Sequence, residues 1–132
     1  MNCARRRALG LAAGLLWFAS AQAAPPPAVQ VEINYLLSTV SMSDCEFFRN
    51  GTWYDAKFAA AHLKSKLQYL LAKDLVQNSE DFIEKAATAS SLSGRPYAIR
   101  CPGREAVPTG QWLLILLARY RDSHLDSVSA VK

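Results

Sequence analysis

The sequence has 132 residues, of which 51% are hydrophobic and 20% are charged, with a formal net charge of +4. A chain of this length accommodates one domain, and its apolar fraction is that of a folded rather than a disordered protein. Without Arg5, Arg6 and Arg7 of the first segment, the remaining 12 basic residues nearly balance the 11 acidic ones. This balance gives no electrostatic reason to expect a nucleic acid or an anionic membrane as partner.

Residues 1–23 have the pattern of a secretory signal. Three arginines precede an apolar stretch at residues 8–21, and Ala21-Gln22-Ala23 supplies the small residues that signal peptidase accepts. We expect export and cleavage after Ala23. The stretch is shorter than the roughly 20 apolar residues of a spanning helix, so no membrane span is expected after cleavage. An uncleaved anchor or a hydrophobic first helix of the domain is the alternative.

A proline-rich leader at residues 24–28 is expected to precede a single domain at residues 29–123, with a polar tail at residues 124–132. The domain opens with apolar residues at helical spacing, which predict an amphipathic helix that ends near Ser41. The apolar residues of this stripe are Val29, Ile33, Leu36, Leu37 and Val40.

Residues 45–54 change to an aromatic-rich pattern interrupted by Asn50-Gly51. Asn-Gly is typical of a tight hairpin turn, because such a turn needs positive φ at both central positions. The predicted register pairs Phe48 with Trp53 and Phe47 with Tyr54.

Two helices are predicted next. Asp55 is the expected N-cap of a long helix that ends near Val76, and Asn78 or Ser79 is the expected cap of a shorter one. The apolar positions of the long helix include Phe58, Ala59, Leu63, Leu67, Leu70 and Leu71, and the expected buried side of the shorter one is Phe82, Ile83, Ala86 and Ala87.

A turn at residues 90–96 leads into a predicted third strand at residues 97–101. The last element starts near Thr109, a candidate N-cap, and has seven consecutive apolar residues. A buried strand is an alternative, but the length of the segment and its charged ending favour a helix. The sequence thus predicts an α+β domain, with about four helices packed on a small three-stranded antiparallel sheet.

Two cysteines, Cys45 and Cys101, remain once Cys3 leaves with the signal. In an oxidising compartment two cysteines usually pair, so one structural disulfide is predicted between them. Two separate buried thiols are the alternative.

A search for catalytic chemistry gives no assignment. His62 and His124 lie far apart, without cysteine or carboxylate at metal-ligand spacing, so neither a metal site nor a cofactor is expected. A hydrolase that pairs His62 with a serine of residues 90–93 is a weaker hypothesis, because no nucleophile motif surrounds these serines. Their position beside a glycine and a proline is that of turn residues. No catalytic residue is therefore assigned.

One group of residues is a candidate ligand cleft. His62 and Lys66 share a face of the long helix, while Arg49, Arg95 and Tyr97 lie beside the two predicted turns. If the disulfide draws these segments together, they form a cationic and aromatic cleft that suits a carboxylate, a phosphate or an acidic peptide. The simpler interpretation, which we favour at this point, is that His62 is a hydrogen-bonded, half-buried side chain and the others are solvated.

The order of several short motifs resembles the YfeK-like family of small bacterial periplasmic proteins, from about Ile33 to Arg121. Arg95 stands where such sequences more usually carry lysine. The resemblance implies the periplasm of a Gram-negative bacterium and a domain of unknown function, with no activity or catalytic residue to transfer. The motifs are Cys45-x-Phe47-x-Arg49-Asn50-Gly51-x-x-Tyr54, His62-Leu63-x-x-Lys66, Glu80-Asp81-Phe82-Ile83, Ser90-Ser91-x-Ser93-Gly94-x-Pro96-Tyr97, Cys101 and Trp112-Leu113.

The function that we expect is that of a non-catalytic binding or interaction module of the cell envelope, with an anionic small ligand or an envelope protein as partner. An inhibitor or accessory of an envelope enzyme is an alternative, for which a protruding Asn50-Gly51 hairpin or loop at residues 90–96 would be the sign. A structural or stress-related envelope protein is another.

Overall fold

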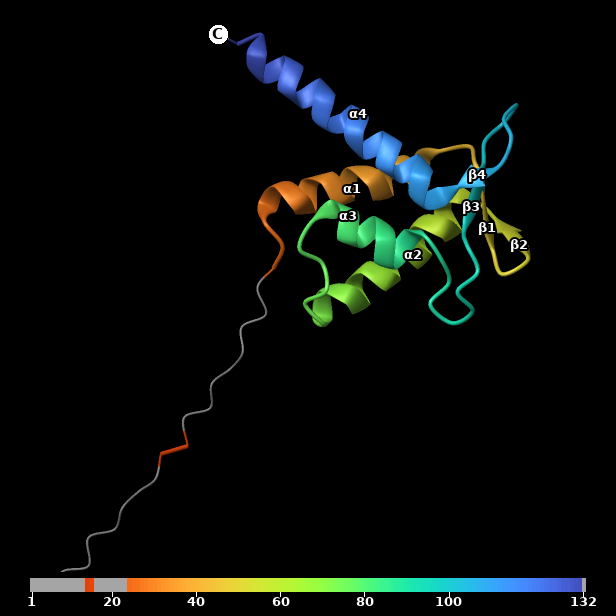
Figure 1. Ribbon diagram of the computed structural model, residues 1–132, viewed down its shortest axis with the longest axis horizontal. Helices are drawn as coiled ribbons and strands as arrows, with labels where there is room; N and C mark the ends of the chain where they lie inside the picture. The colour runs from red at the N-terminus through yellow and green to blue at the C-terminus, as the bar shows by residue number, and fades with distance from the viewer. Residues whose placement is uncertain (1–13, 16–23, 132) are drawn as a thin grey trace, which may run out of the picture.

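The structure is a computed structural model that describes residues 14–15 and 24–131. Apart from residues 14 and 15, the predicted signal at residues 1–23 lies outside the described residues, so its cleavage stays a prediction. The described chain is an α+β fold in which helices pack on an antiparallel sheet, as Figure 1 shows. In chain order its elements are α1 (Pro27–Met42), β1 (Glu46–Arg49), β2 (Thr52–Tyr54), α2 (Ala56–Ala72), α3 (Ser79–Phe82), the π-helical turn η1 (Ile83–Ala87), β3 (Ala98–Arg100), β4 (Val107–Pro108) and α4 (Thr109–Ser129).

The first helix begins earlier than predicted. α1 starts at Pro27, inside the expected leader, because proline is well suited to the first helical position, where its missing N–H is not needed. Its buried residues, Ile33, Leu36 and Val40, belong to the predicted apolar stripe. α1 packs against α2, α3 and α4, and so forms the centre of the helical layer.

The two predicted N-caps in the middle of the chain are confirmed. The Asp55 side chain accepts a hydrogen bond from the backbone N–H of Phe58, and the Asn78 side chain accepts one from Asp81. α2 ends at Ala72, four residues before the predicted end. The reason is a Schellman motif: Asp74 has a φ of 56°, and the N–H of Leu75 donates to the Leu70 carbonyl.

The sheet has four strands in the order β2-β1-β3-β4, so the predicted number of three is wrong. The hairpin register is as predicted, and β3 lies beside β1. The strand missing from the prediction is β4, which pairs Pro108 with Ala98 and Val107 with Ile99. A two-residue strand has no readable alternation, and its proline fits only at the edge of a sheet, where no N–H is required.

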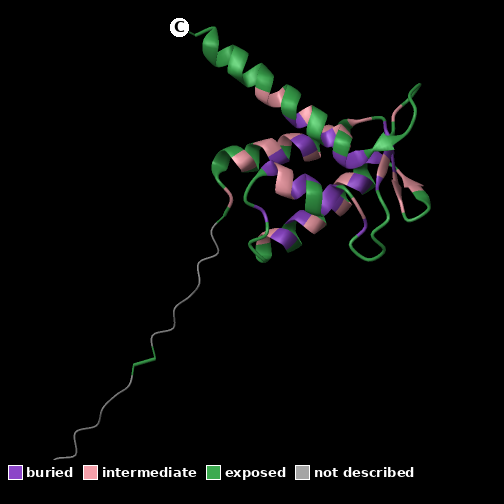
Figure 2. Ribbon diagram, in the orientation of Figure 1, coloured by how far each residue is buried: buried purple, intermediate pink, exposed green. Residues whose placement is uncertain are grey.

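The last helix corrects two expectations. Thr109 is not the N-cap of α4 but its first residue, following Pro108, and no side chain caps this end. The helix continues to Ser129, so residues 124–129 of the predicted polar tail are helical. The reason is that residues 111–132 contain no glycine or proline to stop it. This outer part of α4 projects from the rest of the described chain and is exposed (Figures 1 and 2).

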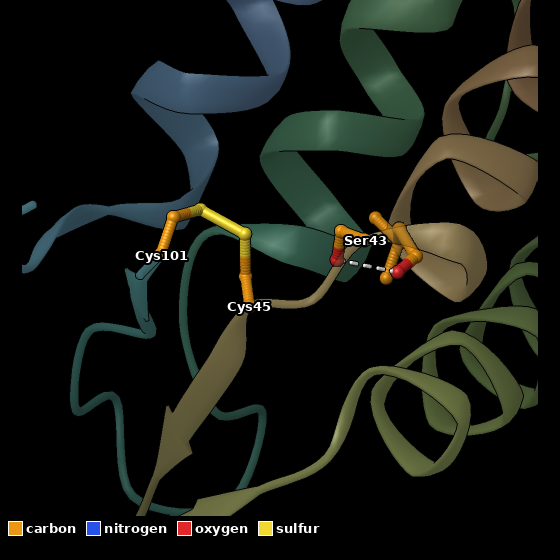
Figure 3. The surroundings of a disulfide bond; sticks show 4 residues. Ser43, Cys45 and Cys101 are labelled. Carbon is orange, nitrogen blue, oxygen red and sulfur yellow. Dashed lines mark hydrogen bonds between the residues drawn. A yellow bond between two sulfur atoms is a disulfide. The ribbon is translucent and has the colours of Figure 1, made fainter. Parts of the chain in front are cut away.

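The disulfide between Cys45 and Cys101 is present, which confirms the predicted pair (Figure 3). Cys45 precedes β1 and Cys101 follows β3, and their Cα atoms are 4.1 Å apart. Beside it, the Ser43 hydroxyl donates to the Val40 carbonyl at the end of α1 (Figure 3). The bond therefore joins the two central strands, β1 and β3, at the end of the sheet where the chain arrives from α1.

Candidate functional site

Tyr97 is the centre of the candidate site. It is buried just before β3, and its hydroxyl lies 3.3 Å from His62 Nε2 and 3.3 Å from Lys66 Nζ. Both partners stand on one face of α2 because they are four residues apart. Lys66 Nζ also donates to the Ala89 carbonyl at 3.1 Å and lies 5.0 Å from the centre of the Tyr97 ring. These contacts hold the lysine over the phenol.

Arg49, at the end of β1, completes a group that we name the basic cluster: Arg49, His62 and Lys66 around Tyr97. Burial lowers the pKa of His62, and the charges of Arg49 and Lys66 lower it further. Burial also lowers the pKa of Lys66, again with help from Arg49. For the Tyr97 phenol, burial raises the pKa, and the Arg49 charge opposes this change. The three basic side chains therefore repel one another in partly desolvated surroundings.

Within the described residues, the basic cluster has no carboxylate partner. The ion pairs found there join Lys85 to Asp81, Arg100 to Glu46, and Arg121 to both Glu32 and Glu80. Three half-buried bases without an acidic neighbour are unusual, because charged groups removed from water are normally paired. The cluster has the composition of an anion site.

A cavity of about 30 Å³ adjoins the basic cluster, and we name it the aromatic cavity. It lies between α2 and the sheet. Arg49, His62 and Tyr97 of the cluster contribute to its wall. The aromatic residues Phe47, Phe48, Tyr54 and Phe58 form much of the rest. The site thus combines positive charge with an apolar wall.

Arg95 does not share these contacts. Its side chain is exposed and lies beside the hairpin turn, where a guanidinium nitrogen would be 4.0 Å from a Cβ at Gly51. The fold therefore brings Arg49, His62, Lys66 and Tyr97 together, while Arg95 lies beside the hairpin turn. Ligand binding by this group stays a prediction.

The serines of the hydrolase hypothesis have other partners. Ser90 Oγ accepts from the Asn50 side-chain amide at 3.2 Å, and Ser93 Oγ donates to the Asn50 side-chain oxygen at 2.7 Å. The side-chain hydrogen bond of His62, in the described part of the chain, is with Tyr97. Ser90 and Ser93 thus fasten the loop to the hairpin turn, and neither forms a hydrogen bond with His62 in the described part of the chain.

A second polar group was not found by sequence reasoning. Arg121 of α4 forms bidentate hydrogen bonds with Glu32 of α1 and Glu80 of α3, and Ser79 Oγ donates to Glu32. Hydrogen bonds from Arg121 lower the pKa of both carboxyl groups. The available signal was that Glu32 is the one charged residue between residues 24 and 43. Because Arg121 is hydrogen-bonded to both carboxylates, this group ties helices together rather than offering a site.

No three histidine, cysteine or carboxylate residues in the described part of the chain lie close enough together to hold a metal ion. No helix in that part of the chain has the length and hydropathy needed to cross a membrane.

Comparison with known proteins places the chain in a family. A family of unknown function, DUF5329, matches residues 27–121, and the chain belongs to it. This stretch includes the basic cluster, the aromatic cavity and the disulfide. The chain is also similar to the uncharacterized protein YfeK of Salmonella typhimurium, with 33% identity over 69 residues. The matched part makes up 52% of this chain and 56% of that protein. No solved structure matches.

Proposed function

We propose that the chain is exported to the periplasm and acts there as a non-catalytic binding module of the cell envelope, with the basic cluster as its anion-binding site. The observation that carries this proposal is the convergence of Arg49, His62 and Lys66 on Tyr97 without a carboxylate partner among the described residues. A bound anion supplies the missing counter-charge. It thereby relieves the repulsion that lowers the pKa of His62 and Lys66.

The signal-like segment and the disulfide support the location. Disulfides persist in oxidising compartments and are rare in a reducing cytosol. The bond between Cys45 and Cys101 encloses the hairpin, α2 and the whole basic cluster, so its formation after export fits a site that works outside the cytoplasm.

One experiment tests export and binding together. The full-length chain is expressed in a Gram-negative bacterium and recovered from the periplasm. Its mass is then measured by mass spectrometry under denaturing and native conditions. Under denaturing conditions we expect the mass of a chain that begins at Ala24, less the mass of the two hydrogen atoms that are lost when the disulfide forms. We also expect an additional anionic mass in the native spectrum, lost in the double variant Arg49→Gln/Lys66→Gln.

The matched control replaces two exposed arginines outside the cluster, in the variant Arg104→Gln/Arg119→Gln, which removes the same charge. A retained leader would contradict export. An additional mass that is equally present in both double variants, or absent from the wild type even with added acetate or phosphate, would contradict the basic cluster as the site.

A second candidate function, inhibitor or accessory of an envelope enzyme, is favoured by the loop at residues 90–96. Leu92 at its tip is 92% exposed, while Asn50 fastens the loop to the hairpin through Ser90 and Ser93. A tethered loop with an exposed apolar tip resembles the surfaces that insert into enzyme clefts, because little conformational freedom is lost on binding. Leu92→Asp should then abolish the capture of an envelope enzyme while leaving anion binding unchanged.

A further inference from the structure

His62 is the member of the basic cluster whose ordinary pKa, 6.5, lies close to neutral pH. In the described part of the chain, the charged and titratable groups that face it come from three elements. They are Arg49 from β1, Lys66 from α2 and Tyr97 from the segment just before β3. Burial and the positive charges of Arg49 and Lys66 lower the pKa of His62. In the free protein at neutral pH, the imidazole is therefore neutral.

A bound anion reverses part of this effect. Two of the three causes that keep the imidazole neutral are positive charges, and an anion held by Arg49 and Lys66 offsets both. His62 Nε2 and Lys66 Nζ each lie 3.3 Å from the Tyr97 hydroxyl, so an anion that contacts Lys66 is also close to His62. Its negative charge then favours the imidazolium form. By thermodynamic linkage, protonation of His62 must strengthen anion binding by the same factor.

The anion approaches the cluster from the solvent. Arg49, His62 and Lys66 are each half-buried, so each keeps part of its surface in contact with water. The coupling between the anion and His62 is an interaction of charges, which needs no hydrogen bond to the imidazole and no entry into the aromatic cavity. Half-burial strengthens it, because partly buried charges are screened less by salt than exposed ones.

Tyr97 allows His62 to change its protonation state in place. With a neutral imidazole, the phenol hydrogen can point at His62 Nε2, while Lys66 donates to the phenol oxygen. A protonated imidazole carries a hydrogen on both nitrogens and can donate to the same oxygen. Because a hydroxyl both donates and accepts, Tyr97 remains a hydrogen-bond partner of His62 in both states. Proton uptake therefore needs no movement of the ring.

We propose that the basic cluster binds a small anion together with one proton, which His62 takes up from the solvent. The cluster thus holds its anion more tightly at mildly acidic pH and releases it as the pH rises. This inference rests on the proposed anion-binding function and adds the regulation of that same site.

The test is calorimetric titration of the purified, oxidised protein with inorganic sulfate and with acetate. Neither probe changes its charge appreciably between about pH 6 and about pH 8, so a change in affinity over this interval originates in the protein. Each titration is made in two buffers of different ionisation enthalpy, which gives the number of protons taken up per anion.

We expect the wild type to bind either probe at least about fivefold more tightly at about pH 6 than at about pH 8, with net proton uptake. His62→Gln, which does not titrate, should bind with nearly the same affinity at both pH values and without this uptake. The matched control is His124→Gln, which should behave like the wild type because His124 is exposed on the outer part of α4.

The NMR signals of the imidazole rings provide a second measurement that leaves the cluster unchanged. The chain has two histidines, and His124→Gln identifies which signals belong to His62. The pKa of His62 should rise when sulfate saturates the wild type, whereas the pKa of His124 should not change. Arg49→Gln/Lys66→Gln should raise the pKa of His62 in the free protein, because two neighbouring charges are removed, and should abolish the response to sulfate.

Two results would overturn this inference and leave the proposed function standing. One is binding of sulfate or acetate that depends on Arg49 and Lys66 but varies with pH equally in wild type and His62→Gln. The other is a pKa of His62 that a saturating anion leaves unchanged. If neither probe nor inorganic phosphate binds the wild type at either pH, the proposed function falls together with the inference.

Discussion

At the scale of single residues, the contacts of Tyr97 indicate the protonation states in the basic cluster. Lys66 donates to the phenol oxygen, so the phenol hydrogen is free to point at His62 Nε2. A neutral imidazole can accept this hydrogen at Nε2, and burial together with two neighbouring charges lowers the pKa of His62, which favours the neutral form. The surroundings of His62 therefore favour a neutral imidazole between the cations of Arg49 and Lys66.

This leads to a prediction about pH. Because the folded pKa of His62 lies below its ordinary value of 6.5, the unfolded chain binds more protons in the interval between the two values. The contribution of His62 to the free energy of unfolding is thus complete above about pH 6.5 and decreases as the pH falls toward the folded pKa. Replacement by glutamine, which does not titrate, should remove this decrease.

The measurement is urea unfolding of wild type and His62→Gln between about pH 5 and about pH 7.5. His124→Gln is the matched control, because His124 is exposed on the outer part of α4. If the free energy of unfolding changes with pH equally in wild type and His62→Gln, the pH dependence does not come from His62. If the pH dependence is instead weaker in His124→Gln than in wild type, it comes from His124 and not from His62.

The sequence predicts which side chains come together where their spacing on one helix determines it. It does not predict this where the path of a loop determines the direction of a side chain. His62 and Lys66 share a helix face by their spacing alone, and Asp55 precedes a helix in the position of a cap. Arg95 is different, since its direction depends on how residues 90–96 fold back on the hairpin. Glu32 has one local signal, because it is the one charged residue between residues 24 and 43, but this signal does not identify its partner.

At the scale of elements, the helical layer is joined by the pairs that Arg121 makes with Glu32 and Glu80. These pairs connect α1, α3 and α4, which have few other polar contacts in the described part of the chain. Glu80 lies in the first turn of α3, where the helix dipole favours a carboxylate, and this place gives no sign of its partner. A pair separated by 41 residues leaves no periodic trace in the sequence.

Replacement of Arg121 should therefore weaken the helical layer. Arg121→Gln leaves two neighbouring carboxylates without their cation and should lower the free energy of unfolding by about 1 kcal/mol at neutral pH, a value discounted because the arginine is partly exposed. Arg119→Gln, an exposed neighbour on the same helix, is the control for lost charge.

The same variant predicts a change in acid stability. The folded pKa values of Glu32 and Glu80 lie below 4.5, so their contribution is complete above this value and is lost as the pH falls through the folded values. Arg121→Gln should reduce that loss. Chemical unfolding at neutral and acid pH checks both expectations, and an unchanged midpoint at neutral pH would mean that the pairs contribute nothing.

Elements themselves are predicted best where a turn residue dictates geometry. Asn50 and Gly51 both adopt positive φ, as a tight hairpin requires, and the strand register follows from that turn. β4 has no such signal. Its pairing with β3 depends on where the chain after Cys101 returns to the sheet, and only the folded chain determines this.

At the scale of the whole molecule, the disulfide closes a loop of the chain that contains the basic cluster. Cys45 and Cys101 are 56 residues apart in the sequence, and all four residues of the basic cluster lie between them. The bond links β1, which ends at Arg49, to β3, which follows Tyr97. The position of Arg49 relative to Tyr97 thus depends on the closed loop.

Reduction of the bond should affect stability and binding together. Closing a loop of this length lowers the entropy of the unfolded chain, which corresponds to about 4 kcal/mol in the chain-entropy model. Reductant should therefore lower the urea midpoint of the wild type. It should leave the midpoint of Cys45→Ala/Cys101→Ala, which lacks the bond, unchanged. Under conditions where the reduced protein is still folded, its affinity for acetate or phosphate should fall as well, because Arg49 is then less firmly placed beside Tyr97. A lower midpoint with unchanged affinity would show that the helical layer alone positions the basic cluster. An unchanged midpoint, with two thiols that react with an alkylating reagent before reduction, would show that the bond does not form.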